Sequence, residues 1–107
     1  MIRISILYPN SKGSRFDVPY YIDRHMPRAI QLLSAHPGFR GVSVEKGLAG
    51  AEPNSEPAYA AMCHFLFEST DAFMAAFIPH APELQGDIPN YTNVSPVIQI
   101  NEVLISK

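Results

Sequence analysis

The stretch that decides the fold is Tyr59-Ala60-Ala61-Met62-Cys63-His64-Phe65-Leu66-Phe67, which is almost wholly apolar. A strand with one wet face would carry a polar side chain at every second position, and this stretch does not. Such a run is typical of a strand that is covered on both faces. A loop rich in turn-forming residues, Gly50–Pro57, precedes it and predicts a hairpin. We therefore expect a strand over residues 58–67 with something packed on each side of it.

Three further strands and two helices are expected around this stretch. Residues 2–8 alternate in polarity, and residues 39–47 and 92–105 have strand-like composition. A helix is expected from Asp17, as N-cap, to about residue 35, with Pro27 kinking or interrupting it. Ser69 or Thr70 caps the second helix. The order βαββαβ predicts an α+β, ferredoxin-like fold: an antiparallel four-stranded sheet with both helices on one face.

Length and composition fit one globular domain over residues 1–107. The chain is 47% hydrophobic and 17% charged, with a net charge of −2 and scattered basic residues, so no nucleic-acid partner is expected. No apolar run is long enough to span a membrane, and the alternating start lacks the features of a signal peptide, which favours a cytoplasmic location. Cys63 is the only cysteine, so no internal disulfide can form.

The sheet face away from the helices needs a cover, because residues 58–67 are apolar on both faces. The candidate of suitable size is a second copy of the chain. The sequence therefore predicts a homodimer formed sheet to sheet, with a cavity for a small apolar organic ligand between the two copies.

The first helix carries a dense polar cluster that includes Tyr20, Tyr21 and His25. On a helical wheel, His25 lies about 60° from the centre of the apolar arc, where its ring is half-buried and one nitrogen stays reachable. Tyr21 is its neighbour on the same flank, whereas Tyr20 lies on the far side. A histidine so placed can act as a general base, or it can be a boundary histidine with local hydrogen bonds. The apolar arc itself comprises Val18, Ile22, Met26, Ala29, Ile30 and Leu33.

His64 is the second candidate for chemistry, and its role depends on the strand register. The bulkier set Cys63-Phe65-Phe67 should face the helices, which places Met62 and His64 in the predicted cavity. A slip of one residue would reverse this assignment, and His64 can equally be a hydrogen-bonded interface histidine. On the other strands, the residues that should face the predicted cavity are Ser5, Leu7, Ser43, Glu45, Val97, Gln99 and Asn101. The candidate substrate-binding residues are Ser5, Leu7, Glu45, Met62 and Gln99 on the strands, together with Tyr20 on the first helix.

No cofactor is indicated. The four histidines lack the local spacing of metal ligands, and His36 and His80 stand beside prolines at helix ends, as capping or loop residues do. No glycine-rich nucleotide-binding motif is present.

The motif Phe16-Asp17-x-x-Tyr20-Tyr21-x-x-x-His25-x-Pro27 resembles the signature of the EthD family, named for a protein of the ethyl tert-butyl ether degradation cluster. The resemblance covers essentially the whole chain and implies a dimeric α+β barrel. Proteins of similar build include lactone isomerases, polyketide cyclases and cofactor-independent monooxygenases. In the similar methylmuconolactone isomerases, a histidine on the first helix takes part in the active site, and the matching position here is His25.

Two functions are compatible with these features. In the first, a metal-free enzyme of small-molecule catabolism binds an apolar, oxygenated, cyclic or aromatic compound. His25 moves a proton and Tyr21 or His64 polarises a carbonyl, in an isomerase, cyclase or cofactor-free oxygenase reaction. In the second, the chain is a non-catalytic accessory or ligand-binding module of a degradation pathway. An oligomerisation domain with a filled interface is a third reading.

Overall fold

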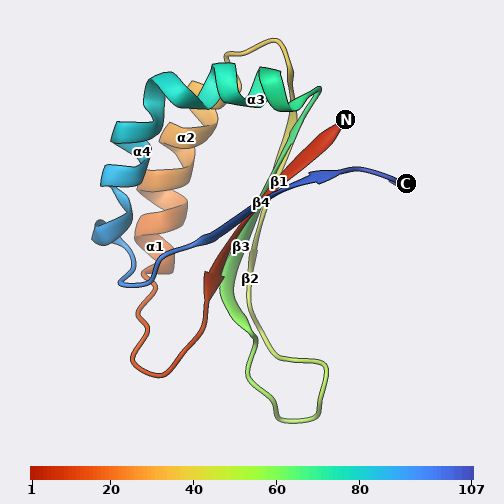
Figure 1. The fold of residues 1–107 in the computed structure, drawn as a ribbon. Coiled ribbons are helices and arrows are strands. Elements are labelled where there is room, and N and C mark those ends of the chain that lie inside the picture. Colours follow the sequence, from red (N-terminus) through yellow and green to blue (C-terminus); the bar gives the residue numbers. More distant parts are fainter.

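The computed structural model describes residues 1–107 and has one antiparallel sheet with all its helices on one side (Figure 1). The strand order β2-β3-β1-β4 is that of a ferredoxin-like fold, as the sequence predicted. The strands are β1 (Ile2–Pro9), β2 (Phe39–Lys46), β3 (Tyr59–Phe67) and β4 (Val97–Glu102). No helix has the length and apolar character needed to cross a membrane.

Two helical segments cover the inner face of the sheet (Figure 1). The first joins α1 (Val18–Tyr20), a π-helical turn η1 (Tyr21–His25) and α2 (Met26–Leu33). The second joins α3 (Thr70–Phe77), η2 (Ile78–His80), α4 (Ala81–Gly86) and η3 (Ile88–Asn90). Both begin at the predicted caps. The Asp17 carboxylate accepts a hydrogen bond from the Tyr20 N–H at 3.0 Å, and the Ser69 hydroxyl accepts one from the Ala72 N–H at 3.1 Å.

The first helix differs from an ideal helix in the turn that holds the candidate histidine. The Met26 N–H bonds to the Tyr21 carbonyl, a π-type bond that adds one residue to the turn just before Pro27. The added residue shifts the phase of the helix. Ile22, which was expected in the apolar arc, is 45% exposed, whereas Tyr21 is 1% and His25 8% exposed. The predicted apolar arc is therefore wrong at Ile22. His25 is more deeply buried than was predicted for a residue at the edge of that arc.

The register of β3 is the one that the sequence predicted. Cys63, Phe65 and Phe67 are at most 2% exposed and belong to the core beneath the helices. Met62 and His64 lie on the outer face, where His64 pairs with Ser5 of β1. Of the two alternating sets of residues on β3, the set that contains Cys63 therefore faces the helices, and the set that contains His64 faces away from them.

The segment between β3 and β4 is more helical than expected. Pro79, Pro82 and Pro89 each lie in the first turn of a short helix, where the missing N–H has no helical partner to lose. The strand expected over residues 92–105 is shorter, Val97–Glu102, because Thr92 makes only an isolated bridge to Phe16. The extra helices bring Asp87 and Tyr91 under the first helix.

Candidate functional site

A cavity of about 380 Å³ lies between the two helical segments and the inner face of the sheet. Of its 20 lining residues, 17 are hydrophobic, which suits a small apolar ligand. The cavity opens beside β4, where its lining residues Ile98 and Ile100 remain 51% and 39% exposed. Its few polar groups include His25, Gln85 and the hydroxyls of Tyr8, Tyr21 and Tyr91.

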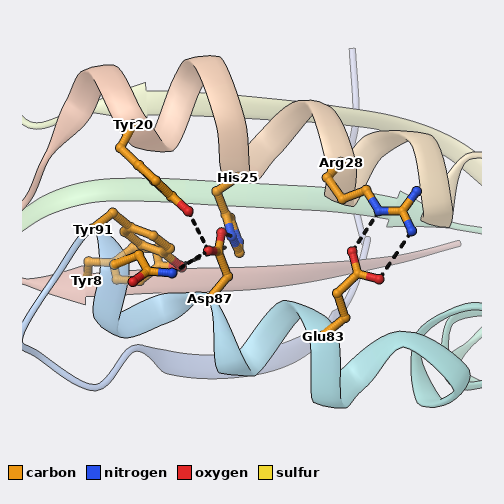
Figure 2. A network of polar contacts seen from close by, with 8 residues as sticks. Tyr8, Tyr20, His25, Arg28, Glu83, Asp87 and Tyr91 are labelled. Carbon is orange, nitrogen blue, oxygen red and sulfur yellow. Dashed lines mark hydrogen bonds and ion pairs between the residues drawn. The ribbon is translucent and has the colours of Figure 1, made fainter.

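Four polar side chains from distant parts of the chain form a connected row at this cavity (Figure 2). The Tyr8 hydroxyl, from β1, lies 2.6 Å from the Tyr91 hydroxyl, which follows η3. The Tyr91 hydroxyl lies 3.4 Å from His25 Nε2, and His25 Nδ1 lies 2.9 Å from Asp87 Oδ2. The row thus runs from the sheet, through the imidazole ring, to a carboxylate between α4 and η3.

The Asp87 carboxylate is held ionised by its neighbours. Its Oδ1 accepts hydrogen bonds from the Tyr20 hydroxyl at 2.6 Å and from Asn90 Nδ2 at 2.9 Å. Burial raises the pKa of Asp87, but the hydrogen bonds from Tyr20, Asn90 and His25 outweigh it and hold that pKa below its usual range.

The ionised Asp87 fixes the tautomer of His25. An ionised carboxylate can only accept hydrogen bonds, so His25 Nδ1 must carry the proton that it shares with Asp87. In the neutral ring, Nε2 then presents its lone pair to Tyr91 at the cavity. This is the arrangement by which a carboxylate orients a histidine as a general base.

His25 also borders a second hollow, of about 390 Å³, on the solvent side of the helices. This hollow is lined mostly by polar residues, among them Tyr20, Arg24 and Asp87. Beside it, Arg28 pairs with Glu83 at 2.6 Å and joins α2 to α4 (Figure 2). The imidazole therefore separates an apolar cavity from a polar surface.

Tyr21 and Cys63 line the cavity as neutral groups. The Tyr21 ring stacks on His25, with ring centroids 5.6 Å apart and an interplanar angle of 14°. Burial raises the pKa of the Tyr21 hydroxyl far above its usual range. Burial also raises the pKa of the Cys63 thiol to about 12, so no thiolate nucleophile forms at neutral pH.

His64 lies on the other side of the sheet and does not reach this cavity. Its Nδ1 is 2.9 Å from the Ser5 hydroxyl, and its Nε2 is 3.3 Å from Glu45 Oε1. Asn101 donates to the Ser5 hydroxyl at 3.1 Å, and Gln99 donates to Asn101 at 2.6 Å. Ser5, His64 and Asn101, together with Ser43, line a separate hollow of about 650 Å³.

The expectation that one cavity, between two sheets, would serve both histidines is corrected by this geometry. His25 approaches the inner face of the sheet from a helix, whereas His64 projects from the outer face, so the sheet stands between them. Of the expected ligand-binding residues, Ser5, Glu45, Met62 and Gln99 share the face of His64, and Leu7 pairs with Met62 there. Tyr20 was placed far from His25, yet both bond to Asp87.

The sequence did not single out Asp87, Tyr91 or Tyr8. Tyr91 fell just before an expected strand, and Asp87 fell in a stretch where prolines obscured the helices. The one usable signal is the turn-forming run Asp87-Ile88-Pro89-Asn90, which marks a sharp change of direction. Contacts that join residues more than sixty positions apart leave no local pattern.

Replacing Asp87 with asparagine is expected to destabilise the protein by about 1–3 kcal/mol at neutral pH, because charge-assisted hydrogen bonds are lost. The folded-state pKa of Asp87 lies below its usual 3.8, so this contribution is complete above that value and is lost as pH falls through the folded-state pKa. Thermal unfolding at pH 7 and at about pH 3 measures it. The difference between wild type and Asp87→Asn should narrow once the pH falls below about 3.8, the usual pKa of the carboxyl.

The matched control for Asp87→Asn is Glu83→Gln, which removes an exposed carboxylate of α4 that is paired with Arg28. This variant should unfold close to the wild type at pH 7, because solvent screens exposed ion pairs. A penalty for Asp87→Asn that stays constant down to pH 3 would refute an ionised, hydrogen-bonded Asp87.

Comparison with known proteins places this chain in a family. The model of the EthD domain matches residues 16–95. An EthD-like protein from Ralstonia eutropha has a solved structure that is 43% identical, covers 99% of this chain and 94% of its own, and superposes with a TM-score of 0.91. An ethyl tert-butyl ether degradation (EthD) family protein from Bacillus halodurans is 19% identical over 97% and 99% of the two chains, with a TM-score of 0.71.

More distant structures share the fold. SnoaB, a cofactor-independent oxygenase from Streptomyces nogalater, is 16% identical over 99% of this chain and 97% of its own, with a TM-score of 0.55. No protein of curated function matches the chain. The EthD match includes the signature helix, Asp87 and most of the residues that line the cavity. The chain belongs to the EthD family and has a ferredoxin-like α+β fold.

Proposed function

We propose that the protein binds an apolar, oxygenated, cyclic or aromatic small molecule in the cavity between helices and sheet, and that His25 transfers a proton there. The reaction would be an isomerisation, a cyclisation or a cofactor-free oxygenation. One observation carries this proposal: His25 is bonded to the ionised Asp87 and directs Nε2 to the wall of an apolar cavity. A small-molecule role also agrees with the EthD match and with the shared fold of SnoaB.

Proton transfer suits this site because its parts have separate tasks. Asp87 orients the imidazole and stabilises the positive charge that His25 gains when it takes a proton. The apolar wall, with Ile4 and Ile6 of β1 among its members, holds the ligand and excludes water. The cavity volume of about 380 Å³ admits a compound of one or two fused rings.

A non-catalytic binding module is the second candidate. The observation that favours it is that His25, Asp87 and Tyr91 already hydrogen-bond to one another, as a purely structural polar network would. A module of this kind would bind the same class of ligand and return it unchanged.

Hydrogen exchange of a carbon acid distinguishes the two candidates. The probe is 2-tetralone, a bicyclic ketone whose α-hydrogens exchange with D₂O when a base removes them. Purified protein should bind 2-tetralone and accelerate its exchange, measured by proton NMR. Binding without any acceleration would refute proton transfer and support the accessory role.

We further propose that two copies associate through the outer faces of their sheets. Leu7 of β1 lies between Met62 of β3 and Val97 of β4, which gives this face an apolar centre. The polar row of His64, Ser5 and Glu45 lies on the same face. A two-fold axis would place each patch against its own copy.

Replacing Leu7 with glutamate is expected to convert the dimer to a monomer, because the new carboxylate would be buried among apolar groups without a partner. Sedimentation velocity measures the mass of each form. Leu48→Glu is the control, since Leu48 is 86% exposed and a charge there should leave the dimer intact. A monomeric wild type, or a dimer that Leu7→Glu leaves unchanged, would contradict this interface.

A further inference from the structure

We propose that Gln85 of α4 determines ligand specificity at the cavity, and that it selects ligands with an uncharged hydrogen-bonding substituent, such as a hydroxyl, on the end that lies away from His25. The inference rests on the proposed function and deepens it, because it names a second group that the ligand carries. The composition and the depth of the cavity lining carry the argument.

Gln85 differs from the other polar residues of the lining in being open to solvent. The others are buried, at most 8% exposed, and they are His25, Cys63, Tyr8, Tyr21 and Tyr91. Gln85 is exposed, and its side-chain amide makes no hydrogen bond within the chain. A ligand that enters the cavity can therefore reach this amide without displacing a partner inside the protein.

The position of Gln85 on α4 directs it to the apolar cavity. With about 100° of rotation per residue, Glu83 and Gln85 lie on nearly opposite sides of the helix. Glu83 lines the polar hollow and pairs there with Arg28, whereas Gln85 lines the apolar cavity and not the hollow. The two polar side chains of α4 thus serve different surfaces.

Exposure divides the lining into a rim and an inner wall. The rim is formed by the exposed lining residues, which are Met74 at 37%, Ile100 at 39%, Ile98 at 51% and Gln85. The inner wall includes His25, which is 8% exposed. A ligand that fills the volume of about 380 Å³ extends from the inner wall to the rim. When its reacting carbon lies at His25, its far end lies beside Gln85.

An amide at the rim reverses the preference that an apolar wall would have. A wall of hydrocarbon groups favours a methyl substituent over a hydroxyl, because the hydroxyl loses hydrogen bonds to water when it is buried. The Gln85 side chain offers both an acceptor oxygen and a donor NH₂ group, so it can replace those bonds for a hydroxyl or a carbonyl. Gln85 is therefore the group that makes a polar substituent acceptable.

The lining also limits the charge of that substituent. No Lys, Arg, Asp or Glu lines the apolar cavity. Arg24 and Arg28 border the polar hollow on the other side of the helices. A carboxylate at the rim would lose part of its hydration and find no cationic partner. The site therefore suits an uncharged substituent.

Three 2-tetralones that carry a hydroxyl, a methyl or a carboxylate at ring position 6 test this assignment. Hydroxyl and methyl are similar in size, so the ratio of the methyl Kd to the hydroxyl Kd, measured by titration calorimetry at about pH 7, reports the hydrogen bond. Gln85→Met retains the length of the side chain and removes the amide, and this ratio should fall about three- to tenfold. The carboxylate should bind wild type at least about tenfold more weakly than the hydroxyl compound.

Gln31→Met is the matched control, because Gln31 is an exposed residue of α2 that does not line the cavity. It should leave the ratio at the wild-type value. A change in the shape of the rim would alter both Kd values alike and cancel in the ratio. Circular dichroism verifies folding. A ratio that folded Gln85→Met leaves unchanged, or a carboxylate that binds as tightly as the hydroxyl compound, would overturn the assignment.

Hydrogen exchange of the 6-hydroxy compound adds a kinetic readout. Because Gln85 binds the end away from the reacting carbon, Gln85→Met should raise KM about three- to tenfold and leave kcat unchanged. A lower kcat with an unchanged KM would contradict a role in specificity.

The outcomes separate this assignment from the proposed function. If the ratio depends on Gln85 but no compound exchanges faster with D₂O, Gln85 determines specificity and proton transfer by His25 fails. If exchange is accelerated but the ratio does not depend on Gln85, proton transfer stands and the assignment of Gln85 is wrong. If none of the three compounds binds, both proposals are refuted.

Discussion

Replacing His25 with asparagine is expected to lower the rate of 2-tetralone exchange by about 10²–10⁴-fold, the usual contribution of a positioned general base. The dissociation constant should change little, because the cavity wall is apolar and most of the ligand contacts do not involve His25. Proton NMR in D₂O gives the rate, and titration calorimetry gives the affinity.

Glu83→Gln is the control for the His25 experiment, since its carboxylate pairs with Arg28 and lies in the polar hollow beyond the ring. It should retain the wild-type exchange rate. His25→Asn with full exchange activity would remove the histidine from the mechanism, whatever the affinity.

Replacing Phe67 with alanine is expected to destabilise the fold by about 3–5 kcal/mol, the usual cost of removing a large buried aromatic side chain. Phe67 is 0% exposed. Its ring meets those of Phe39 on β2 and Phe73 on α3 edge to face, with centroids 5.7 and 5.4 Å away. In the wild type, the Phe67 ring therefore packs between the sheet and the second helical segment, and the substitution removes this contact. Urea denaturation measures the change.

Leu104→Ala is the control for Phe67→Ala, because Leu104 is 83% exposed after the end of β4. Its free energy of unfolding should stay within about 0.5 kcal/mol of the wild type. A loss below about 1 kcal/mol for Phe67→Ala would contradict the packing of β3 under the helices.

The sheet could be predicted from the sequence because its signals are local. Alternation in residues 2–8 and the bulk of Cys63, Phe65 and Phe67 decide which face meets the helices, and the structure has that register. The first helix could not be predicted fully. A wheel with 3.6 residues per turn cannot represent the π turn at Tyr21–His25, so Ile22 was placed inward.

The candidate site was predicted only in part, for a physical reason. His25 and Tyr21 stand out because they lie on one helix and stack directly. Asp87 and Tyr91 complete the site from positions that are distant in the sequence, and only the folded chain brings them to His25. His64 was grouped with His25 because the cavity was expected between two sheets, whereas the cavity that His25 lines is closed by the helices of the same chain.

The proposed ligand site lies between the helices and the sheet. Isotope-filtered nuclear Overhauser contacts between bound 2-tetralone and the methyl groups of the protein locate the ligand. We expect contacts to Ile4, Ile6 and Ile98, which line the cavity. Contacts to Met62 and Leu66 instead would place the ligand on the outer face beside His64 and would refute this site.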